Sequence, residues 1–492
     1  MNILFAVSEA EPYVKTGGLA DVAGNLPRAL AKRGHRLILF LPLYQEIRLK
    51  NPALAEVARV TVPLGAEPVP GVVLEKVDPD FPGCRTFFIR QDDFFDRPHL
   101  YGPPGEEYPD NGPRFIFFCR AILEAVKQLG LEIDIYHAHD WQTALLPVYL
   151  KTLYRDLASA SGAASLFTIH NLGYQGIQEK EIFPLTGLDW SEFTYEKLEY
   201  YDRLNLLKGG LVYADILNTV SPTYSREILQ AEFGFGLEGV LQQRRNELFG
   251  ILNGVDYDIW DPAVDPYISP HYRIGRMSGK KRCKEKLLQK CGLPVLGARP
   301  LVGMVSRLVN QKGFDLILEL LDAIDCFDCA FFFLGTGEKE IEKQLADRAR
   351  ACPEKISFIC DYDNRLAHQL EAGADIFLMP SAYEPCGLNQ LYSLRYGTVP
   401  LVRAVGGLND SITDFNPTTG RGNGFKFFPY TTEALAATLE RALSLYRKPR
   451  LWWKLRGNGM RCDFSWAASA RQYEELYRRM QGLSGKPAKK QP

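Results

Sequence analysis

The 492-residue sequence lacks a strong excess of either charge: 58 Lys and Arg stand against 59 Asp and Glu, for a net charge of −1. A nearly neutral chain has no broad basic surface, so neither nucleic acid nor an anionic membrane is expected as a partner. No apolar run approaches the roughly 20 residues that span a bilayer. No secretory core and no Arg- and Ser-rich transit segment opens the chain, so we expect a cytoplasmic or already mature protein.

Disulfide and metal frameworks are also missing. The ten cysteines are scattered without a secretory signal, which predicts reduced thiols. Cys326 and Cys329 form a C-x-x-C pair, but no second pair at zinc spacing accompanies it and it does not open a helix. His137 and His139, with Asp140, could hold zinc because alternate strand residues share a face. No further ligand pattern supports that alternative, and no metal is expected.

Short apolar runs alternate with helical patterns along the chain. This alternation is typical of doubly wound α/β domains, and the length predicts about two to four domains. An aperiodic stretch at 260–280 is the expected linker. We therefore predict an N-terminal domain at 1–262, a second domain at 263–464, a final helix at 465–480 and a disordered tail at 481–492. Strands are expected at residues 3–7, 36–41, 72–77, 86–89, 133–137, 166–169, 216–219, 249–252, 301–305, 330–334, 356–359, 376–379 and 399–402.

A glycine pair follows the first predicted strand. Gly17 and Gly18 precede a helical pattern, and Lys15 adds a positive charge just before them. Free N–H groups at a helix start attract anions, and glycine lets the backbone approach a ligand closely. The segment therefore reads either as a phosphate cradle or as a tight turn with a surface lysine. A second feature of this half is the long Pro-, Gly- and aromatic-rich segment at 91–113, which is expected to be a binding loop or lid.

Two segments of the second domain have similar features. Arg307 and Lys312 lie between a strand and a helix that starts after Gly313. They fit a diphosphate site, although two solvated surface charges are the simpler alternative. Glu384 lies in a proline-fixed turn before a helix that starts near Gly387. Its carboxylate could accept hydrogen bonds from sugar hydroxyls, although a helix N-cap is the simpler alternative.

Six motifs of this kind occur in a fixed order. They are Lys-Thr-Gly-Gly-Leu-Ala-Asp-Val at 15–22, His-Ala-His-Asp-Trp at 137–141, His-Asn-Leu at 170–172, Asn-Gly-Val-Asp at 253–256, Ser-Arg-Leu with Gln-Lys-Gly at 306–313, and Glu-Pro-Cys-Gly-Leu at 384–388. The set resembles bacterial glycogen synthase and plant starch synthase, a family of retaining glycosyltransferases. The resemblance extends over residues 1–480.

The resemblance implies two Rossmann-like domains of the GT-B architecture, an active site between them, and a last helix that crosses back to the first domain. It implies ADP-glucose as donor and the non-reducing end of an α-1,4-glucan, such as a glycogen or starch primer, as acceptor. No metal and no pyridoxal phosphate are implied. The oligomeric state stays open, and a plastid stroma location would require a removed transit segment.

The resemblance also assigns roles to single residues. Arg307 and Lys312 match the pyrophosphate clamp, His170 matches the histidine at the glucose 6-OH, and Glu384 matches the carboxylate under the 3-OH. These four are the predicted catalytic residues. The predicted substrate-binding residues are Lys15, Gly17, Gly18, Asp21, His139, Asp140, Asn171, Asn253, Lys284, Tyr362, Cys386, Gly387, Leu388 and Asn389.

Two positions depart from the family pattern. Ala382 stands where the family usually has Arg, and Asn389 stands where it usually has Thr. The missing arginine removes a charge beside the turn that presents Glu384. Front-face transfer with retention is the expected mechanism. A glucan phosphorylase, a sugar-nucleotide epimerase and a non-catalytic glucan-binding protein are the alternatives.

Overall fold

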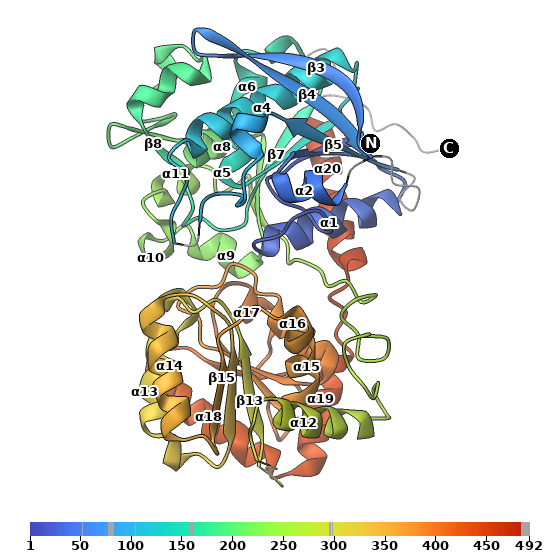
Figure 1. Ribbon diagram of the computed structural model, residues 1–492, viewed down its shortest axis with the longest axis vertical. Helices are drawn as coiled ribbons and strands as arrows, with labels where there is room; N and C mark the ends of the chain where they lie inside the picture. The colour runs from blue at the N-terminus through green and yellow to red at the C-terminus, as the bar shows by residue number, and fades with distance from the viewer. Residues whose placement is uncertain are drawn as a thin grey trace. The chain divides into compact units, whose positions relative to one another are not determined.

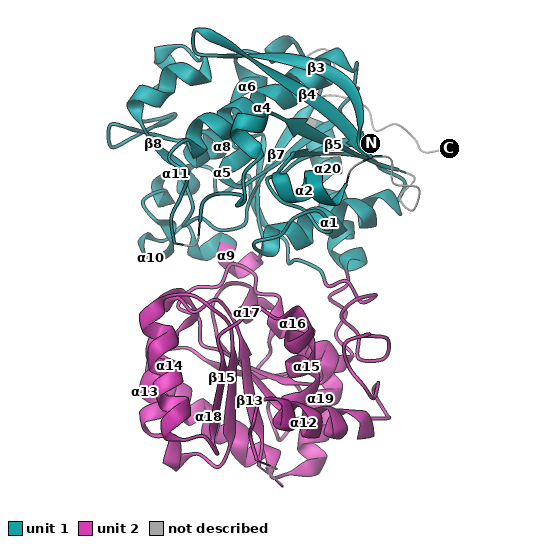
Figure 2. Cartoon of the chain, viewed as in Figure 1, with its two compact units in different colours: residues 1–220, 225–254, 466–492 teal, residues 221–224, 255–465 magenta. Residues whose placement is uncertain are grey.

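The computed structural model of the protein describes all residues except 52, 77–82, 104, 158–161, 295–296, 298 and 484–492. The chain folds into two compact units, each built on its own large sheet (Figures 1 and 2). Unit 1 comprises residues 1–220, 225–254 and the chain from 466 onward, and unit 2 comprises 221–224 and 255–465.

The sheet of unit 1 has nine strands among the described residues, in the order β12-β11-β7-β6-β1-β2-β5-β4-β3. Its first seven strands are parallel, while β4 pairs antiparallel with both β5 and β3. The strands are β1 (Asn2–Ala6), β2 (Arg36–Pro42), β3 (Ala55–Leu64), β4 (Glu67–Lys76), β5 (Cys84–Arg90), β6 (Ile135–His139), β7 (Ala164–Ile169), β11 (Ile216–Thr219) and β12 (Leu248–Gly250). A small antiparallel sheet joins β8 (Ile177–Glu179), β10 (Arg203–Asn205) and β9 (Glu199–Tyr200).

The helices of unit 1 connect these strands. They are α1 (Gly18–Ala31), α2 (Gln45–Lys50), α3 (Asp92–Phe95), α4 (Asn111–Gln128), α5 (Asp140–Thr143), α6 (Leu145–Lys151), α8 (Leu206–Tyr213), α10 (Ala231–Gly234), α11 (Glu238–Gln243) and α20 (Trp466–Leu483), with α9 (Pro222–Glu227) divided between the two units.

Two predictions for unit 1 need correction. Strand β6 does not stop at residue 137 but runs to His139, because His137 and His139 pair with Leu166 and Thr168 of β7. The segment 91–113 is not one loop, since it contains α3 and the start of α4. The fully buried Arg114 holds it by donating to the carbonyl oxygens of Phe94 and Leu100 at 2.7 and 2.9 Å.

Helix α20 packs against α1 and is the last described element of unit 1 (Figure 1). It contains two fully buried tyrosines, Tyr473 and Tyr477. The Tyr477 hydroxyl lies 2.9 Å from His137 Nδ1, and the Tyr473 hydroxyl accepts a 3.0 Å hydrogen bond from Asn218. These bonds tie the end of the chain to β6 and β11. The helix also continues three residues beyond 480, so residues 481–483 are not a disordered tail, and the rest of that prediction lies outside the described residues.

The sheet of unit 2 is parallel throughout, in the order β15-β14-β13-β16-β17-β18. Apolar clusters bury both of its faces: Val302 and Met304 of β13 belong to one, and Leu301 to the other. The strands are β13 (Leu301–Val305), β14 (Ala330–Leu334), β15 (Ile356–Ile359), β16 (Ile376–Met379), β17 (Val399–Arg403) and β18 (Phe425–Phe427). The helices are α12 (Ser278–Lys290), α13 (Phe314–Asp322), α14 (Lys339–Ala351), α15 (Asn364–Gly373), α16 (Asn389–Tyr396), α17 (Gly406–Ser411), α18 (Thr432–Tyr446) and α19 (Pro449–Met460).

The change between units falls at Gly254 and Val255 rather than at 262 and 263. The reason is that Val255 donates its N–H to the Phe464 carbonyl at 2.7 Å and packs with Leu391 and Tyr392. The aperiodic segment after Val255 is thus part of unit 2.

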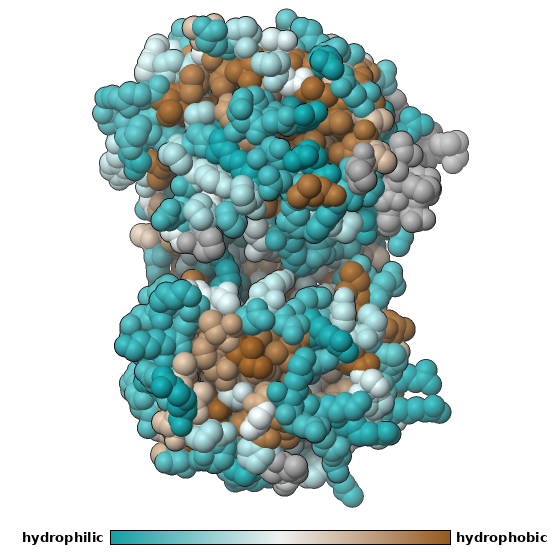
Figure 3. Space-filling model, viewed as in Figure 1, coloured by the Kyte–Doolittle hydropathy of each residue, from teal (hydrophilic) through white to brown (hydrophobic). Residues whose placement is uncertain are grey.

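Hydrophilic residues cover most of the visible face of both units, with apolar residues in scattered groups (Figure 3). Among the described helices, none combines the length and the apolar character needed to cross a membrane. No disulfide joins any of the ten cysteines, all of which lie in the described part of the chain.

Replacing Tyr477 by Phe is expected to lower the free energy of unfolding by about 1–3 kcal/mol, because the fully buried His137 Nδ1 loses its hydrogen-bond partner. Urea denaturation measures the change. Tyr201→Phe is the matched control, since Tyr201 is 82% exposed and should change stability by less than about 0.5 kcal/mol. Equal midpoints for Tyr477→Phe and the wild type would contradict the role given to this bond.

Candidate active site

In unit 1, Lys15 lies at the start of α1 between two carboxylates. Its ammonium group is 2.7 Å from Glu11 Oε1 and 2.8 Å from Asp21 Oδ1. Burial lowers the pKa of Lys15, but Asp21 and Glu11 together outweigh burial and raise that pKa above its ordinary value. Lys15 is therefore a fixed cation at the amino end of a helix, as the sequence predicted.

Glu9 is a residue that the sequence analysis missed. It follows β1, is 4% exposed, and accepts hydrogen bonds from the Thr16 hydroxyl at 2.8 Å, from the Thr16 N–H, and from the Gly17 N–H at 3.3 Å. The Gly17 N–H, which was predicted to bind a phosphate, thus already donates a hydrogen bond to the Glu9 carboxylate. Burial raises the pKa of Glu9, while these hydrogen bonds and the charge of Lys15 lower it. The only sequence signal was an acidic side chain just before the glycine loop.

Asp21 was predicted to bind substrate, and in the structure its carboxylate is a partner of Lys15. Burial raises its pKa to about 6; the charge of Lys15 lowers the pKa, while Glu11 and Glu9 raise it further. Such a carboxyl can change its protonation near neutral pH when the charge of Lys15 is drawn toward another anion.

Three histidine rings lie one beside the next at the ends of β6 and β7. The ring centroids of His137 and His139 are 4.0 Å apart, those of His139 and His170 are 5.3 Å apart, and His139 Nδ1 is 3.0 Å from His170 Nε2. Burial lowers the pKa of His170 to about 3 and holds the pKa of His137 and His139 well below the usual range. The three imidazoles are therefore neutral at pH 7.

His139 and Asp140 support His170. The His139 side chain is fully buried and braces the His170 ring, which places it behind that ring rather than on an open surface. Asp140 has a left-handed backbone (φ 54°) that turns its carboxylate onto the His170 N–H at 2.7 Å. Burial raises the pKa of Asp140 to about 7, although the hydrogen bonds from the His170 and Asn171 backbone lower it.

The two predicted asparagines have different surroundings. Asn171 Oδ1 accepts the Gly173 N–H at 3.0 Å and so shapes the turn after His170. Asn253 is 4% exposed, and its Oδ1 has no hydrogen-bond partner within the described residues. Its role in ligand binding stays a prediction.

The zinc alternative at His137 is not favoured by the geometry. Both ring nitrogens of His137 have partners, namely Tyr477 and Thr168. Within the described residues, no group of three or more His, Cys, Asp or Glu side chains is arranged to hold a metal ion.

In unit 2, the structure brings Lys312 and Glu384 together. The Lys312 ammonium is 2.6 Å from Glu384 Oε2, and the Ser381 hydroxyl donates to the same oxygen at 3.0 Å. Their segments follow β13 and β16, which are neighbours in the sheet, so both reach its carboxyl edge. Arg307 follows β13 on the same edge, and its side chain is exposed.

The turn that presents Glu384 is packed against backbone. A Cβ at Gly406 would lie 1.9 Å from the Glu384 carbonyl oxygen, and one at Gly313 would lie 2.2 Å from that of Pro380. Both positions have a positive φ, so glycine fits each one in conformation and in space. Arg403 at the end of β17 donates to the Ala382 carbonyl and stacks over Tyr430. Neither Arg403 nor Gly406 was predicted from the sequence.

The residues after Glu384 form the start of α16. Gly387 has a positive φ, Leu388 is the N-cap of the helix, and Cys386 is buried. The Asn389 side chain donates to the Val305 carbonyl at 2.8 Å and so ties α16 to β13.

Two predicted residues lie away from this group. Lys284 on α12 binds Asp375 and the Arg299 carbonyl, both at 2.7 Å. Because Asp375 also accepts the N–H of Leu301, the first residue of β13, Lys284 lies at the amino edge of the sheet, opposite Glu384. Tyr362 is 75% exposed and follows β15, two strands from β13 at the carboxyl edge.

Comparison with known proteins gives matches over nearly the whole chain. The starch synthase catalytic domain family matches residues 2–243, and the glycosyl transferases group 1 family matches residues 292–454. The glycogen synthase of Koribacter versatilis (strain Ellin345) is 47% identical over 482 residues, which cover 97% of this chain and 98% of that protein. That of Geotalea daltonii (strain DSM 22248 / JCM 15807 / FRC-32) is 45% identical over 487 residues, which cover 99% of this chain and 100% of that protein.

Among solved structures, the catalytic domain of starch synthase IV from Arabidopsis thaliana bound to ADP and acarbose is similar, with a TM-score of 0.88 and 33% identity. The match covers 98% of this chain and 99% of that one. The predicted fold class, two Rossmann-like α/β domains of the GT-B kind, is thereby confirmed.

The neutral histidines should make stability depend on pH. As the pH falls below about 6.5, an unfolded histidine binds a proton that the folded, buried His137 excludes, so folding stability decreases. Replacing His137 by Gln removes this contribution. The slope of unfolding free energy against pH, measured by urea denaturation between about pH 5 and 6.5, should therefore fall by about 1 kcal/mol per pH unit on average.

His99→Gln is the control for this experiment, because the His99 side chain is exposed and should leave the slope as it is in the wild type. An unchanged slope in His137→Gln would mean that the folded protein already protonates His137.

Proposed function

Because this chain belongs to the glycogen synthase family of glycosyltransferases, we propose that it transfers glucose from ADP-glucose to the non-reducing end of an α-1,4-glucan, with retention of configuration. Identity of 47% over 97% of the chain favours this reaction over the phosphorylase, epimerase and glucan-binding alternatives. ADP in the similar starch synthase structure supports an adenine nucleotide in the donor. The relatives are bacterial proteins, which supports our proposal of a cytoplasmic location.

One observation supports the donor side most strongly: a buried carboxylate and two cations at the carboxyl edge of the unit 2 sheet. Ligands of open α/β sheets bind at this edge. Lys312 lies 2.6 Å from Glu384, and the exposed Arg307 follows β13 at the same edge of the sheet. A carboxylate that accepts sugar hydroxyls next to cations that hold phosphate oxygens matches the two halves of a nucleotide sugar.

The proposed step breaks the bond between glucose C1 and the β-phosphate oxygen while the acceptor 4-OH forms a new bond to C1 from the same face. The acceptor proton passes to the departing phosphate, which leaves as ADP. Arg307 and Lys312 stabilise the negative charge that grows on the diphosphate, and such preorganised charge supplies much of catalysis. Glu384 would hold the sugar as positive charge develops at C1.

Unit 1 residues would contribute to the same reaction. The His170 ring is neutral and braced by His139, so it can donate or accept a hydrogen bond to a sugar hydroxyl without carrying a charge. Lys15 offers a cation at the start of α1, where a phosphate would compete with Glu11 and Asp21 for its ammonium group.

Removing either clamp cation should slow turnover strongly. Arg307→Ala and Lys312→Ala are each expected to reduce kcat by about 10²–10³, by analogy with the loss of an oxyanion-stabilising group. Release of nucleoside diphosphate from ADP-glucose in the presence of a glycogen primer gives the rate. Lys343→Ala, which removes an exposed cation on α14, is the matched control. Near-normal turnover in both clamp variants would contradict the assignment.

The donor and the need for a metal can be tested in one assay. With a glycogen primer, ADP-glucose should be used well and UDP-glucose poorly, and the rate should be the same with and without a chelator, because Arg307 and Lys312 carry the charge that a metal would otherwise carry. If UDP-glucose released diphosphate and ADP-glucose did not, the proposed donor would be wrong. Loss of activity in chelator, restored by a divalent cation, would overturn the metal-free mechanism.

A further inference from the structure

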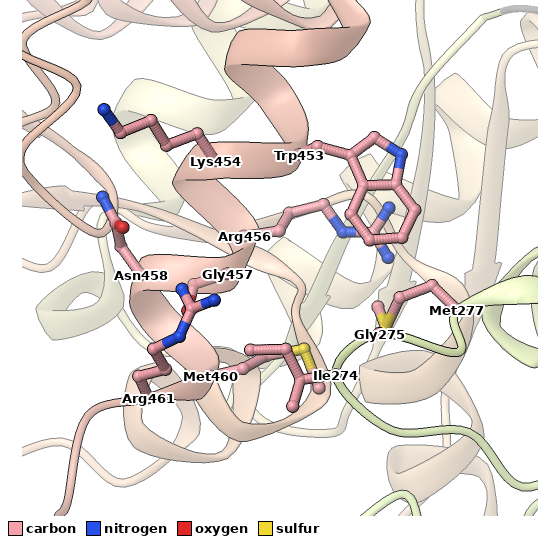
Figure 4. A pocket seen from close by; sticks show the side chains of 10 residues that line it. All are labelled: Ile274, Gly275, Met277, Trp453, Lys454, Arg456, Gly457, Asn458, Met460 and Arg461. Atoms are coloured by element: carbon pink, nitrogen blue, oxygen red, sulfur yellow. The ribbon is translucent and has the colours of Figure 1, made fainter.

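We propose that unit 2 has a second ligand site, a pocket beside α19 that binds a small phosphate monoester whose ring stacks on Trp453. The pocket has a volume of about 400 Å³ and lies between α19 and the segment that contains Ile274 and Met277 (Figure 4). Pockets of about 300–1,000 Å³ are typical of small-molecule sites. The donor-site residues Arg307, Lys312 and Glu384 are not among those that line it.

The charge of the pocket is positive. Lys454, Arg456 and Arg461 line it, and the lining, which consists of described residues, contains no Asp or Glu. Lys454 donates one long hydrogen bond, 3.5 Å, to the Thr419 carbonyl, and Arg461 donates to the Gly457 carbonyl at 2.9 Å. Within the described part of the chain, neither cation has a carboxylate partner. Two cations without a carboxylate partner, next to the Arg456 guanidinium, favour an anion with several acceptor oxygens.

Arg456 adds an unsatisfied donor. Its Nε donates to the Gly397 carbonyl at 2.9 Å, but its buried Nη2 has no hydrogen-bond partner among the described residues. The positive charge of Arg456 also acts on the buried Lys280, whose pKa falls to about 7, first because of burial and then because of Arg456. An acceptor oxygen delivered by a ligand would satisfy the donor and offset the charge.

The aromatic and apolar residues that line the rest of the pocket can pack against the ring of a sugar or a base. Trp453 is 49% exposed, and its indole lies beside the Arg456 guanidinium (Figure 4). The guanidinium carbon of Arg456 is 5.8 Å from the centroid of the indole ring. Ile274 and Met277 add apolar surface from the opposite segment. An exposed indole next to cations can stack on the apolar face of a sugar or on a base while the cations hold the phosphate. A sugar phosphate and a nucleoside monophosphate share this chemistry.

The pocket also has a physical connection to the turn that presents Glu384. The Gly397 carbonyl bound by Arg456 belongs to the C-cap of α16, and the other end of α16 begins directly after Leu388. A ligand on Arg456 would therefore act on one end of the helix whose other end forms the proposed donor site. The binding test below does not depend on that function.

Isothermal titration calorimetry on the full chain tests the site, with inorganic phosphate, glucose 6-phosphate and AMP as probes. All titrations use a Lys312→Ala background, which removes a clamp cation of the proposed donor site. One of the two esters should bind at least about tenfold more tightly than inorganic phosphate, and which one does so identifies the source of the ring.

Paired variants locate the binding. Lys454→Ala/Arg461→Ala should weaken binding of that ester by about tenfold or more, and so should the gentler Lys454→Gln/Arg461→Gln. Lys448→Ala/Arg450→Ala removes two exposed cations at the start of α19, outside the pocket, and should change the affinity less than about twofold. Trp453→Ala should weaken the ester but not inorganic phosphate.

Three results would overturn the proposal. The first is no heat from either ester at about 10 mM, a concentration that detects even weak binding. The second is wild-type affinity in both pocket double variants with native circular dichroism. The third is an unchanged ester affinity in Trp453→Ala. Each result is independent of whether Arg307 and Lys312 prove necessary for glucosyl transfer.

Discussion

The 2.6 Å ion pair between Lys312 and Glu384 is the interaction on which the unit 2 site depends. Both side chains leave the carboxyl edge of one parallel sheet from neighbouring strands, β13 and β16, so the strand order itself brings them together. The close backbone approaches at Gly313 and Gly406 then fix the two turns. A partly buried pair is costly unless further bonds satisfy it, and the Ser381 hydroxyl supplies one. The pair holds a carboxylate next to a cation, which is the arrangement that the proposed donor site requires.

The charged groups of unit 1 have a different arrangement from the ion pair of unit 2. Here one lysine is surrounded by carboxylates: Glu11 and Asp21 bind Lys15 directly, and Glu9 holds the backbone that leads from it into α1. An entering phosphate must therefore displace acidic partners, not merely fill a basic pocket. Asp21, with a pKa of about 6, can take up a proton when that happens. We infer that these carboxylates compensate the charge of Lys15 until an anion binds, which limits the cost of a partly buried cation.

The sequence was most informative where the chain is apolar and continuous. The predicted bounds of β11, β13, β14, β15 and β16 agree with the structure because buried parallel strands appear as short apolar runs. Strand β3 was missed, since it is a partly exposed edge strand that contains Pro63. The residues of the site were found through ordered motifs, but their partners were not: Tyr477 and His137 are 340 positions apart. Glu9, Arg403 and the true surroundings of Lys284 depend on such long-range contacts, which no local pattern encodes.

Ala382 illustrates why a departure from a family pattern need not disturb the turn around it. The resemblance leads one to expect a cationic side chain at this position, and Ala382 has none. Arg403, however, donates to the main-chain carbonyl of Ala382, a group that every residue possesses. The guanidinium is itself held by stacking 4.8 Å from the Tyr430 ring centroid, and the Tyr430 hydroxyl donates to Asp315 at 2.6 Å. A positive charge thus stays beside the Glu384 turn although the side chain at 382 does not supply it. Because the contact is made to the backbone, this hydrogen bond does not require an arginine side chain at 382.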